Sequence, residues 1–189
     1  MVTHYKKSWL SAFKTLTVFT LAMLFSGYSF GQLSGTKYVI DKNGTASSTV
    51  YKSFKDFVSD LQSGTRSDGG TPAGPGVDAA VAVTVAAKSG PYTEQIRIPA
   101  IKGASAKNTI TFDGNGQTLQ FTATSSSNSY TIRLDGADYI TVKDLTIIGS
   151  GTSYGRCVHL RSSADNNVIE GCNLQLPNIG STSNYNAYV

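Results

Sequence analysis

The sequence predicts an all-β protein, a right-handed parallel β-helix (solenoid) with an N-terminal capping helix. Three observations lead to this fold class: a gap-free internal repeat, many short strands in which apolar and polar residues alternate, and a single amphipathic helix ahead of them. The composition agrees, because Thr, Ser, Gly, Asn, Ile and Val dominate over Leu, Glu and Lys. We expect a leader at 1–31, a strand, capping helix and loop at 32–78, and β-helix coils at 79–189.

Residues 1–31 have the three regions of a secretory signal peptide. A start with three lysines and no acidic residue is followed by an apolar run at 16–25 and then by small residues. The run is shorter than the roughly 20 residues that a membrane span needs, so a cleaved leader is favoured over an uncleaved anchor. Cleavage is expected between Gly31 and Gln32, which places the mature protein in the medium or on the outer cell surface.

The charge of the chain lies largely in this leader. The whole sequence has 16 Lys and Arg against 12 Asp and Glu, a formal charge of +4. Without the three leader lysines the charge falls to +1, so the basic pI is no evidence for nucleic acid or an anionic membrane as a partner. The remaining chain is long enough for one domain.

The N-terminal part of the mature chain predicts one strand and one helix. A short strand is expected at 37–40, and the helix at 53–63. Ser53 is the expected N-cap, with Asp56 three residues later and Gly64 at the end. The apolar stripe of this helix consists of Phe54, Phe57, Val58 and Leu61. An isolated helix must bury its apolar face, and we expect it to cover the open end of the β structure that follows. Residues 64–78 are expected to be a loop.

Short strands fill the rest of the chain. In segments such as Ile96-Arg97-Ile98 and Ile132-Arg133-Leu134, apolar and polar residues alternate, which places one face in a core and the other in water. The predicted strands are 79–85, 94–98, 109–112, 118–121, 130–134, 139–142, 145–148, 157–160, 168–169 and 172–176.

An internal repeat argues for parallel stacking of these strands rather than hairpins. Residues 137–147 align without gaps on 164–174, which begin 27 residues later, and the alignment places Val142 on Ile169. A period in the twenties with about three short strands is typical of a solenoid. Each coil leaves its strand edges open and must stack on a neighbour.

The segment 89–112 resembles the opening of large secreted β-helix proteins of Bacteroidetes type. The resemblance is carried by its phrases Gly-Pro-Tyr-Thr-Glu-Gln, Ile-Pro-Ala-Ile and Asn-Thr-Ile-Thr-Phe. Both copies of the repeat resemble the pectin-lyase-like coil, and the helix at 53–63 lies where those proteins have an N-terminal cap. The resemblance implies a fold rather than an activity, because this scaffold carries lyases, hydrolases and adhesins. Members are usually longer, so we expect this chain to be an N-terminal fragment.

Several acidic residues could serve sugar chemistry, but turn roles explain them better. The motif Asp-Gly-Asn-Gly-Gln at 113–117 resembles a turn near the start of polygalacturonase β-helices, whose Asn-Thr-Asp, Asp-Asp, Gly-His-Gly and Arg-Ile-Lys elements are absent here. Asp135, Asp138 and Asp144 could form a carboxylate pair, yet Asp-Gly steps and strand ends are typical of corners. Glu94 and Glu170 are far apart in sequence.

The basic and aromatic residues can also be interpreted either as functional or as structural. Lyases of this fold use Arg or Lys as a base beside calcium-binding acids, and Arg133 and Arg161 could be placed so. Without an accompanying cluster of acids, we expect them to be solvated on a sheet face, as we expect His159 to point outward. Five tyrosines lie among polar residues and could stack on sugar rings or fill core and edge positions: Tyr130, Tyr139, Tyr154, Tyr185 and Tyr188.

The cysteines and asparagines have structural interpretations. Export permits a disulfide between Cys157 and Cys172. The repeat gives Cys172 a core position, whereas Cys157 should face outward or lie at a bend, so two free thiols are favoured. A ladder of asparagines that hydrogen-bonds successive coils is expected from Asn166, Asn167 and Asn173.

Two functions stay open. The first is a secreted or cell-surface scaffold for adhesion or carbohydrate contact, with no catalysis in this segment. The second is the N-terminal part of a polysaccharide lyase or glycoside hydrolase whose active coils lie beyond Val189. We expect no catalytic residue, metal ligand or cofactor-binding residue in this segment. A polysaccharide is the candidate partner, and neither nucleic acid nor a membrane span after cleavage is expected.

Overall fold

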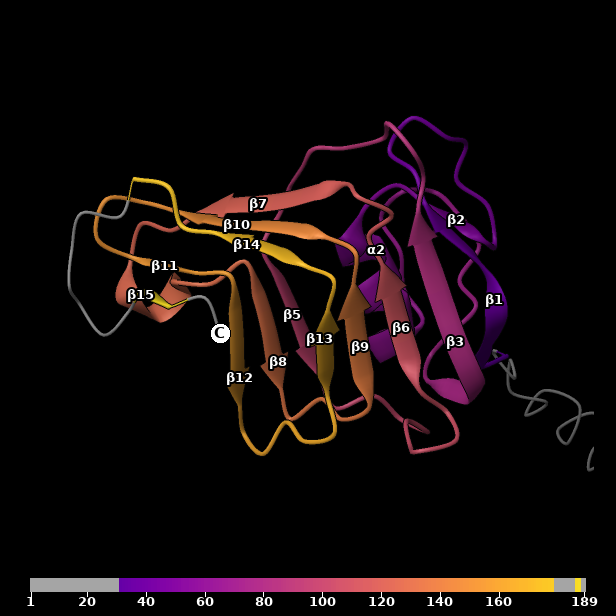
Figure 1. Cartoon of the computed structure of the whole chain (residues 1–189). Coiled ribbons are helices and arrows are strands. Elements are labelled where there is room, and N and C mark those ends of the chain that lie inside the picture. The colour runs from indigo at the N-terminus through magenta and orange to yellow at the C-terminus, as the bar shows by residue number, and fades with distance from the viewer. Residues whose placement is uncertain (1–30, 179–185, 188–189) are drawn as a thin grey trace, which may run out of the picture.

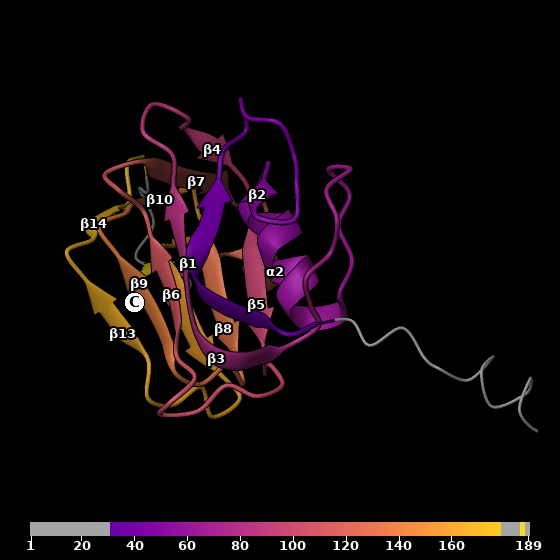
Figure 2. The ribbon, with the colours of Figure 1, turned by 90° about the vertical axis from the view of Figure 1, so that its right-hand side faces the viewer.

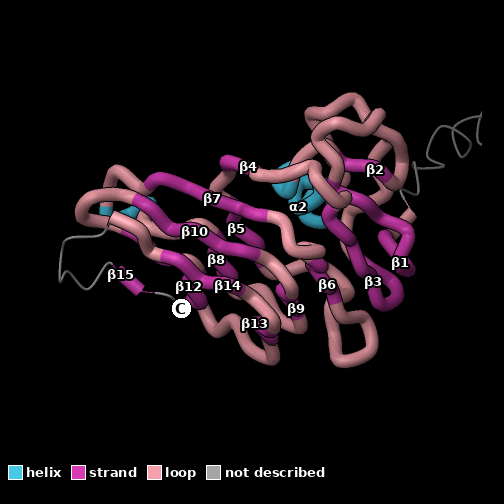
Figure 3. Tube along the Cα trace, turned by 45° about the horizontal axis from the view of Figure 1, so that its top comes forward, coloured by secondary structure: helices cyan, strands magenta, loops and turns pink. Residues whose placement is uncertain are grey.

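The computed structural model describes residues 31–178 and 186–187. This part of the chain is rich in β-strands, its strand pairs run parallel, and α2 (Phe54–Ser63) is its one α-helix (Figures 1 and 3). The predicted leader lies outside the described residues, apart from Gly31. Within the described part, no helix is long and apolar enough to cross a membrane.

The strands form three main sheets and one short pair. The six-stranded sheet, in the order β13-β9-β6-β3-β1-β2, contains β1 (Leu33–Ile40), β2 (Val50–Tyr51), β3 (Val77–Val85), β6 (Ile110–Asp113), β9 (Ile140–Lys143) and β13 (Val168–Glu170). The four-stranded sheet, in the order β14-β10-β7-β4, contains β4 (Tyr92–Thr93), β7 (Thr118–Thr122), β10 (Thr146–Ser150) and β14 (Asn173–Gln175). The three-stranded sheet, in the order β12-β8-β5, contains β5 (Ile96–Pro99), β8 (Ile132–Asp135) and β12 (Val158–Arg161). The short pair joins β11 (Gly155–Arg156) to β15 (Asn186–Ala187).

The chain visits the three main sheets in rotation, and we call one passage through them a circuit. The circuits are β3 to β5, β6 to β8, β9 to β12, and a fourth that starts with β13 and β14. Strands of successive circuits lie side by side, as Figure 1 shows for β7, β10 and β14. The register pairs Val142 with Ile169 and Ile147 with Leu174, the residues that the repeat aligns. The predicted parallel stacking is thus confirmed, and the arrangement is compatible with a parallel β-helix.

Inward side chains from the three sheets form one hydrophobic core. Alternate residues of β5, β6, β8 and β9 are buried, as the pattern of apolar and polar residues predicts. Stacked aliphatic rows run from circuit to circuit, for example Ile96, Ile132 and Val158 in the three-stranded sheet. The partner of Leu134 in β12, Leu160, is 38 % exposed because β12 is the outer strand of its sheet.

The predicted helix closes the N-terminal end of the stack. Ser53 is the N-cap, and its Oγ accepts a hydrogen bond of 3.0 Å from the Asp56 N–H; Gly64 ends the helix with φ of 64°. The helix packs on β5, β1 and β2 (Figure 2). The stripe Phe54, Phe57, Val58 and Leu61 is buried there. The prediction of a helix at 53–63 is therefore confirmed, while the first strand is longer than expected and begins at Leu33.

Buried polar groups attach the loop after the helix to this end of the molecule. Asp60 is fully buried and accepts hydrogen bonds from the Tyr51 hydroxyl at 2.7 Å and from the N–H groups of Ala73 and Gly74, both at 2.9 Å. The guanidinium of Arg66 lies 3.8 Å from the centre of the Tyr51 ring and pairs with Asp68 at 2.7 Å. The irregular segment between α2 and β3 is thus held by hydrogen bonds to acidic side chains and by the packing of Ala73 against the core.

Successive circuits turn their corners with the same backbone conformation. Asp144 and Gly171, which the repeat aligns, have φ of 50° and 59°, and Tyr139 and its aligned residue Asn166 have 60° and 57°. Left-handed backbone is unfavourable for most side chains. Different residue types adopt this left-handed conformation at aligned positions. The stacking of the circuits therefore fixes the backbone of the corner.

The structure differs from the sequence expectations in several details. The strand predicted at 94–98 is present as β5 but begins two residues later, because Glu94 lies between β4 and β5 and its carboxyl group meets the helix. The two-residue strands β2, β4, β11 and β15 were not predicted. Cys157 does not face outward: it lies at the bend between β11 and β12 but is fully buried, since its thiol points to the backbone carbonyls of Ile147 and Gln175. Both cysteines are free, as favoured from the sequence.

Candidate functional site

The outward side of the three-stranded sheet gathers long charged side chains. The register pairs Arg97 with Arg133 and Arg133 with His159, and in the next outward row it pairs Asp135 with Arg161. Figure 1 shows the three strands that carry them, β5, β8 and β12, side by side. We call these five residues the arginine face. They belong to three successive circuits, so the stacking alone brings them together.

One carboxylate ties the strands of this face together. Asp135 accepts from Nε of Arg97 at 2.6 Å and lies 3.3 Å from Nε of Arg161. The hydroxyl of Ser162 donates at 2.7 Å to Oδ1 of Asp135, the oxygen that lies near Arg161. This hydroxyl and the two arginines lower the pKa of Asp135 below the ordinary carboxyl value. These contacts favour the charged form of Asp135, so the sequence interpretation of it as a mere corner residue is incomplete.

Arg133 is not the freely solvated arginine that the sequence suggested. Its guanidinium lies 3.7 Å from the centre of the Tyr130 ring, and Nη2 donates to the carbonyl of Ser127 at 3.1 Å. Its Nε is buried and has no hydrogen-bond partner. Burial lowers the pKa of Arg133, and the nearby arginines add to this effect. Among the described residues it forms no ion pair.

His159 lies beside Arg133 on the outer strand and is half-buried. Its ring centre is 6.4 Å from that of Tyr130, and its Nδ1 is buried without a hydrogen-bond partner. Burial lowers the pKa of His159, and the positive charges of Arg156, Arg133 and Arg161 lower it further. Both effects favour the neutral form of the imidazole. It points away from the core as expected, although it is less exposed than a surface position implies.

The segment that carries Tyr130 is fixed by side chains from neighbouring circuits. Nε2 of Gln95 donates to the carbonyls of Asn128 at 3.0 Å and Tyr130 at 2.7 Å. Arg156 donates to the Ser129 hydroxyl at 3.0 Å. Tyr130 is only 7 % exposed, so its ring supports Arg133 and is not a free platform for a sugar. Tyr139 and Tyr154 are half-buried, and Tyr185 and Tyr188 lie outside the described residues.

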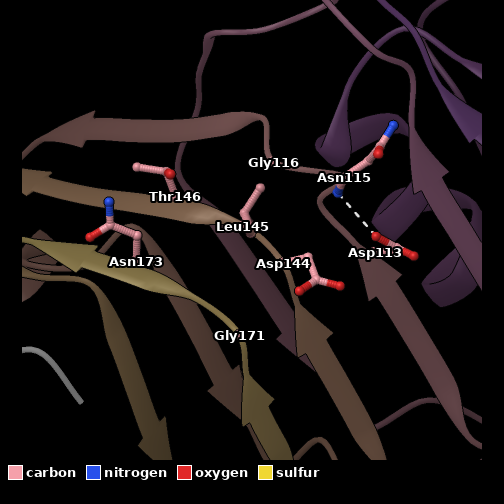
Figure 4. A pocket seen from close by; sticks show the side chains of 8 residues that line it. All are labelled: Asp113, Asn115, Gly116, Asp144, Leu145, Thr146, Gly171 and Asn173. Atoms are coloured by element: carbon pink, nitrogen blue, oxygen red, sulfur yellow. Dashed lines mark hydrogen bonds between the residues drawn. The ribbon is translucent and has the colours of Figure 1, made fainter.

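A second candidate, a polar pocket of about 430 Å³, lies where the six-stranded and four-stranded sheets meet. Figure 4 shows it, and its lining contains Asp113, Asn115, Gly116, Asp144, Leu145, Thr146, Gly171 and Asn173. Asp113 accepts from the Asn115 N–H at 3.0 Å, and Nζ of Lys143 lies 2.8 Å from Asp113 and 3.4 Å from Asp144. Both carboxylates are thus used within the protein.

The motif at 113–117 is a turn, as the sequence predicted. Nδ2 of Asn115 donates to the carbonyl of Val85 at 3.1 Å, and Oε1 of Gln117 accepts from the Gly90 N–H at 3.1 Å, so the turn is bonded to the preceding circuit. A Cβ on Gly114 would lie 2.6 Å from Cα of Leu145 in the following circuit. Glycine is required there for close stacking.

The other acidic and amide candidates also have structural partners. Asp138 accepts from the Asp165 N–H at 2.6 Å. Asn167 accepts from the Ile140 N–H at 2.9 Å and donates to the Ala137 carbonyl at 2.8 Å, so it bonds one circuit to the previous one as predicted. The side chains of Asn166 and Asn173 make no such bond among the described residues, so the predicted asparagine ladder is confirmed for Asn167 alone.

Glu94 and Glu170 do not form a pair. Glu94 accepts from the N–H of Lys55 at 3.0 Å and of Phe54 at 3.4 Å, which places its carboxyl group at the N-terminal, positive end of α2. Burial raises the pKa of Glu94. Glu170 is exposed on β13, in the outer strand of the six-stranded sheet. In the described ranges no group of three or more His, Cys, Asp or Glu could hold a metal ion.

The comparisons with known proteins give no match. No family model matches the chain, and neither a curated protein nor a solved structure does. The arginine face itself is therefore the feature that points to a function. From the sequence, Arg133 and Arg161 were candidates for a base and Asp135 for a carboxylate pair with Asp138 or Asp144, whereas Arg97 was noted only as a polar position of a strand. The available signal was the alternation within 96–98, 132–135 and 158–161, once these strands are placed in register.

Proposed function

We propose that this chain is the right-handed parallel β-helix of an extracellular scaffold that contacts carbohydrate through its arginine face, without cleaving it. The rotation of the chain through three parallel sheets and the pectin-lyase-like resemblance at 89–112 support the fold. The composition of 1–31 supports export to the medium or the outer cell surface.

The observation that carries the proposal is the register of Arg97, Arg133 and His159. Three circuits place long polar side chains in one row across parallel strands, on an outward surface rather than in an enclosed cavity. Small-molecule sites are usually concave and largely apolar. A row of hydrogen-bond donors on an open sheet face suits an extended polymer that crosses the strands.

The state of the acidic residues supports binding rather than hydrolysis. A glycosidase needs one carboxyl group with a raised pKa as the acid. Asp135 has a lowered pKa and is engaged by two arginines and a serine. Asp113 and Asp144 share Lys143. Each of these three carboxylates is therefore engaged by a basic side chain, and Glu94, whose pKa burial raises, is bonded to the N–H groups at the start of α2.

A lyase remains the second candidate, favoured by one observation. Burial lowers the pKa of Arg133, which is the direction that a basic catalyst requires. This function would belong to the same face, so one set of measurements tests both candidates.

The test measures retention and turnover together. The purified protein is run through gels containing a neutral glucan, a polyuronate or a sulfated galactan, and the same polymers are assayed for unsaturated products and new reducing ends. We expect retardation by at least one polymer and no products. The double variant Arg97→Gln, Arg161→Gln should lose most of the retardation. The control Lys107→Gln, which removes an exposed charge away from the face, should not. Retardation by none of the polymers would refute the proposal, and unsaturated products would establish the lyase.

A further inference from the structure

We propose that Arg133 and His159 form a binding seat for an oxyanion, the carboxylate of a uronic acid or the sulfate ester of a sulfated sugar. The inference rests on the proposed function, because it names the chemical class of glycan that the arginine face selects.

The charges on the face leave Arg133 without an opposite partner. Of its three arginines, Arg97 and Arg161 both contact Asp135, which is the only carboxylate of the face. Arg133 forms no ion pair within the described ranges, although its guanidinium is partly removed from water against Tyr130. A partly desolvated cation gains most from an added anion, since less water has to be displaced.

The hydrogen bonding of the two side chains is also incomplete. Nε of Arg133 and Nδ1 of His159 are buried nitrogen atoms without a partner, and they are the only such side-chain atoms among the described residues. The two residues are direct neighbours in the register, on strands about 4.8 Å apart. The imidazole ring of His159 and the guanidinium of Arg133 both lie near the Tyr130 ring. Buried polar atoms usually have partners, so these two side chains are not fully satisfied within the protein, and an oxyanion on the open face would accept from their remaining N–H groups.

Protonation of His159 should strengthen this seat. The imidazole faces Arg133 and Asp135 on β8, Arg161 on β12, Arg156 on β11, and the Tyr130 ring. Three of these are positive and one is negative, so the local field opposes a second proton on the ring. A bound oxyanion reverses part of that field. By linkage, the anion raises the pKa of His159, and acidification tightens anion binding.

The experiment follows the imidazole signals of His159 by NMR while sodium sulfate, sodium glucuronate or glucose is added. The His159→Gln variant identifies the signals. We expect saturable shifts with at least one anion and none with glucose, and affinity at pH 5.5 at least about threefold higher than at pH 7.5. Sulfate and glucuronate distinguish the two sources of the oxyanion.

Variants separate this inference from the proposed function. Arg133→Gln should abolish the shifts while Lys107→Gln keeps them, and Arg133→Lys should retain part of the affinity. A circular dichroism melt shows that each variant is folded. If polymers still retard the Arg133→Gln variant as strongly as the parent, the seat is refuted and the scaffold function stands. If the anions shift His159 but no polymer is retained, the seat stands and the scaffold function falls. Unchanged signals with both anions overturn the inference.

Discussion

The buried hydrogen bond between Tyr51 and Asp60 offers the sharpest test of how the N-terminal end is held. Tyr51→Phe removes one hydroxyl and keeps the ring on which Arg66 lies. Asp60 then keeps the N–H groups of Ala73 and Gly74 but loses its 2.7 Å donor, while remaining fully buried. A hydrogen bond to a charged group contributes about 1.5–3 kcal/mol.

That loss is large against the whole stability of a domain, which is about 5–15 kcal/mol. For a chain of this length it corresponds to a fall in Tm of roughly 2–4 °C per kcal/mol. Urea unfolding at pH 7, followed by circular dichroism, should show a lower midpoint with an unchanged slope.

The matched control is Tyr139→Phe. The Tyr139 hydroxyl has no hydrogen bond among the described residues, and the residue is half-buried. Its loss should change the free energy of unfolding by less than about 0.5 kcal/mol. If Tyr51→Phe and Tyr139→Phe unfold at the same urea concentration, the account of the buried carboxylate is wrong.

Three further outcomes are expected. Gly114→Ala should lower the free energy of unfolding by about 1–3 kcal/mol, because the new Cβ would lie 2.6 Å from the next circuit. The control Gly116→Ala has nothing within 4 Å of its Cβ and should cost only about 1 kcal/mol for its positive φ. If stacking were loose, urea titration would show the reverse order. Burial acts to raise the pKa of Asp68, but hydrogen bonds from an arginine and two backbone N–H groups lower it overall. Its contribution is therefore complete above the ordinary value of 3.8 and is lost as pH falls through the lowered one, so Asp68→Asn should flatten the acid side of a Tm–pH curve. Burial raises the pKa of both thiols, and the fully buried Cys157 should react with a thiol reagent more slowly than Cys172; mass spectrometry finding a disulfide would contradict the geometry.

The fold was accessible from sequence because its signals are local and repeated. The stripe on the helix at 53–63 and the alignment of 137–147 on 164–174 each depend on short spacings, and the register reproduces the alignment. The two-residue strands β2 and β11 carry no periodicity and depend on neighbours. Cys157 lies at a bend, which was one of its two expected positions, but its burial was not predicted because alternation fails at a bend.

The arginine face was harder to predict, because it depends on contacts between circuits. Single residues such as Arg133 look like ordinary surface arginines in the sequence. Only the pairing of β5 with β8 and of β8 with β12 places Arg97 and Arg161 on either side of Asp135. That Arg133 is the arginine without an ion pair follows from side-chain geometry, and composition and spacing do not encode this geometry.

The way in which α2 enters the stack has a consequence for loop entropy. Within the repeat, a strand pairs with one that follows after a single circuit, as Val142 does with Ile169. Ile40 instead pairs with Val85, because α2 and its loop lie between them. Closure entropy grows only with the logarithm of loop length, so this longer excursion costs about 0.5 kcal/mol more than an ordinary circuit. A whole covering element can therefore be inserted between two neighbouring strands at almost the same entropic cost as one more circuit, and lengthening a corner elsewhere should be tolerated equally well.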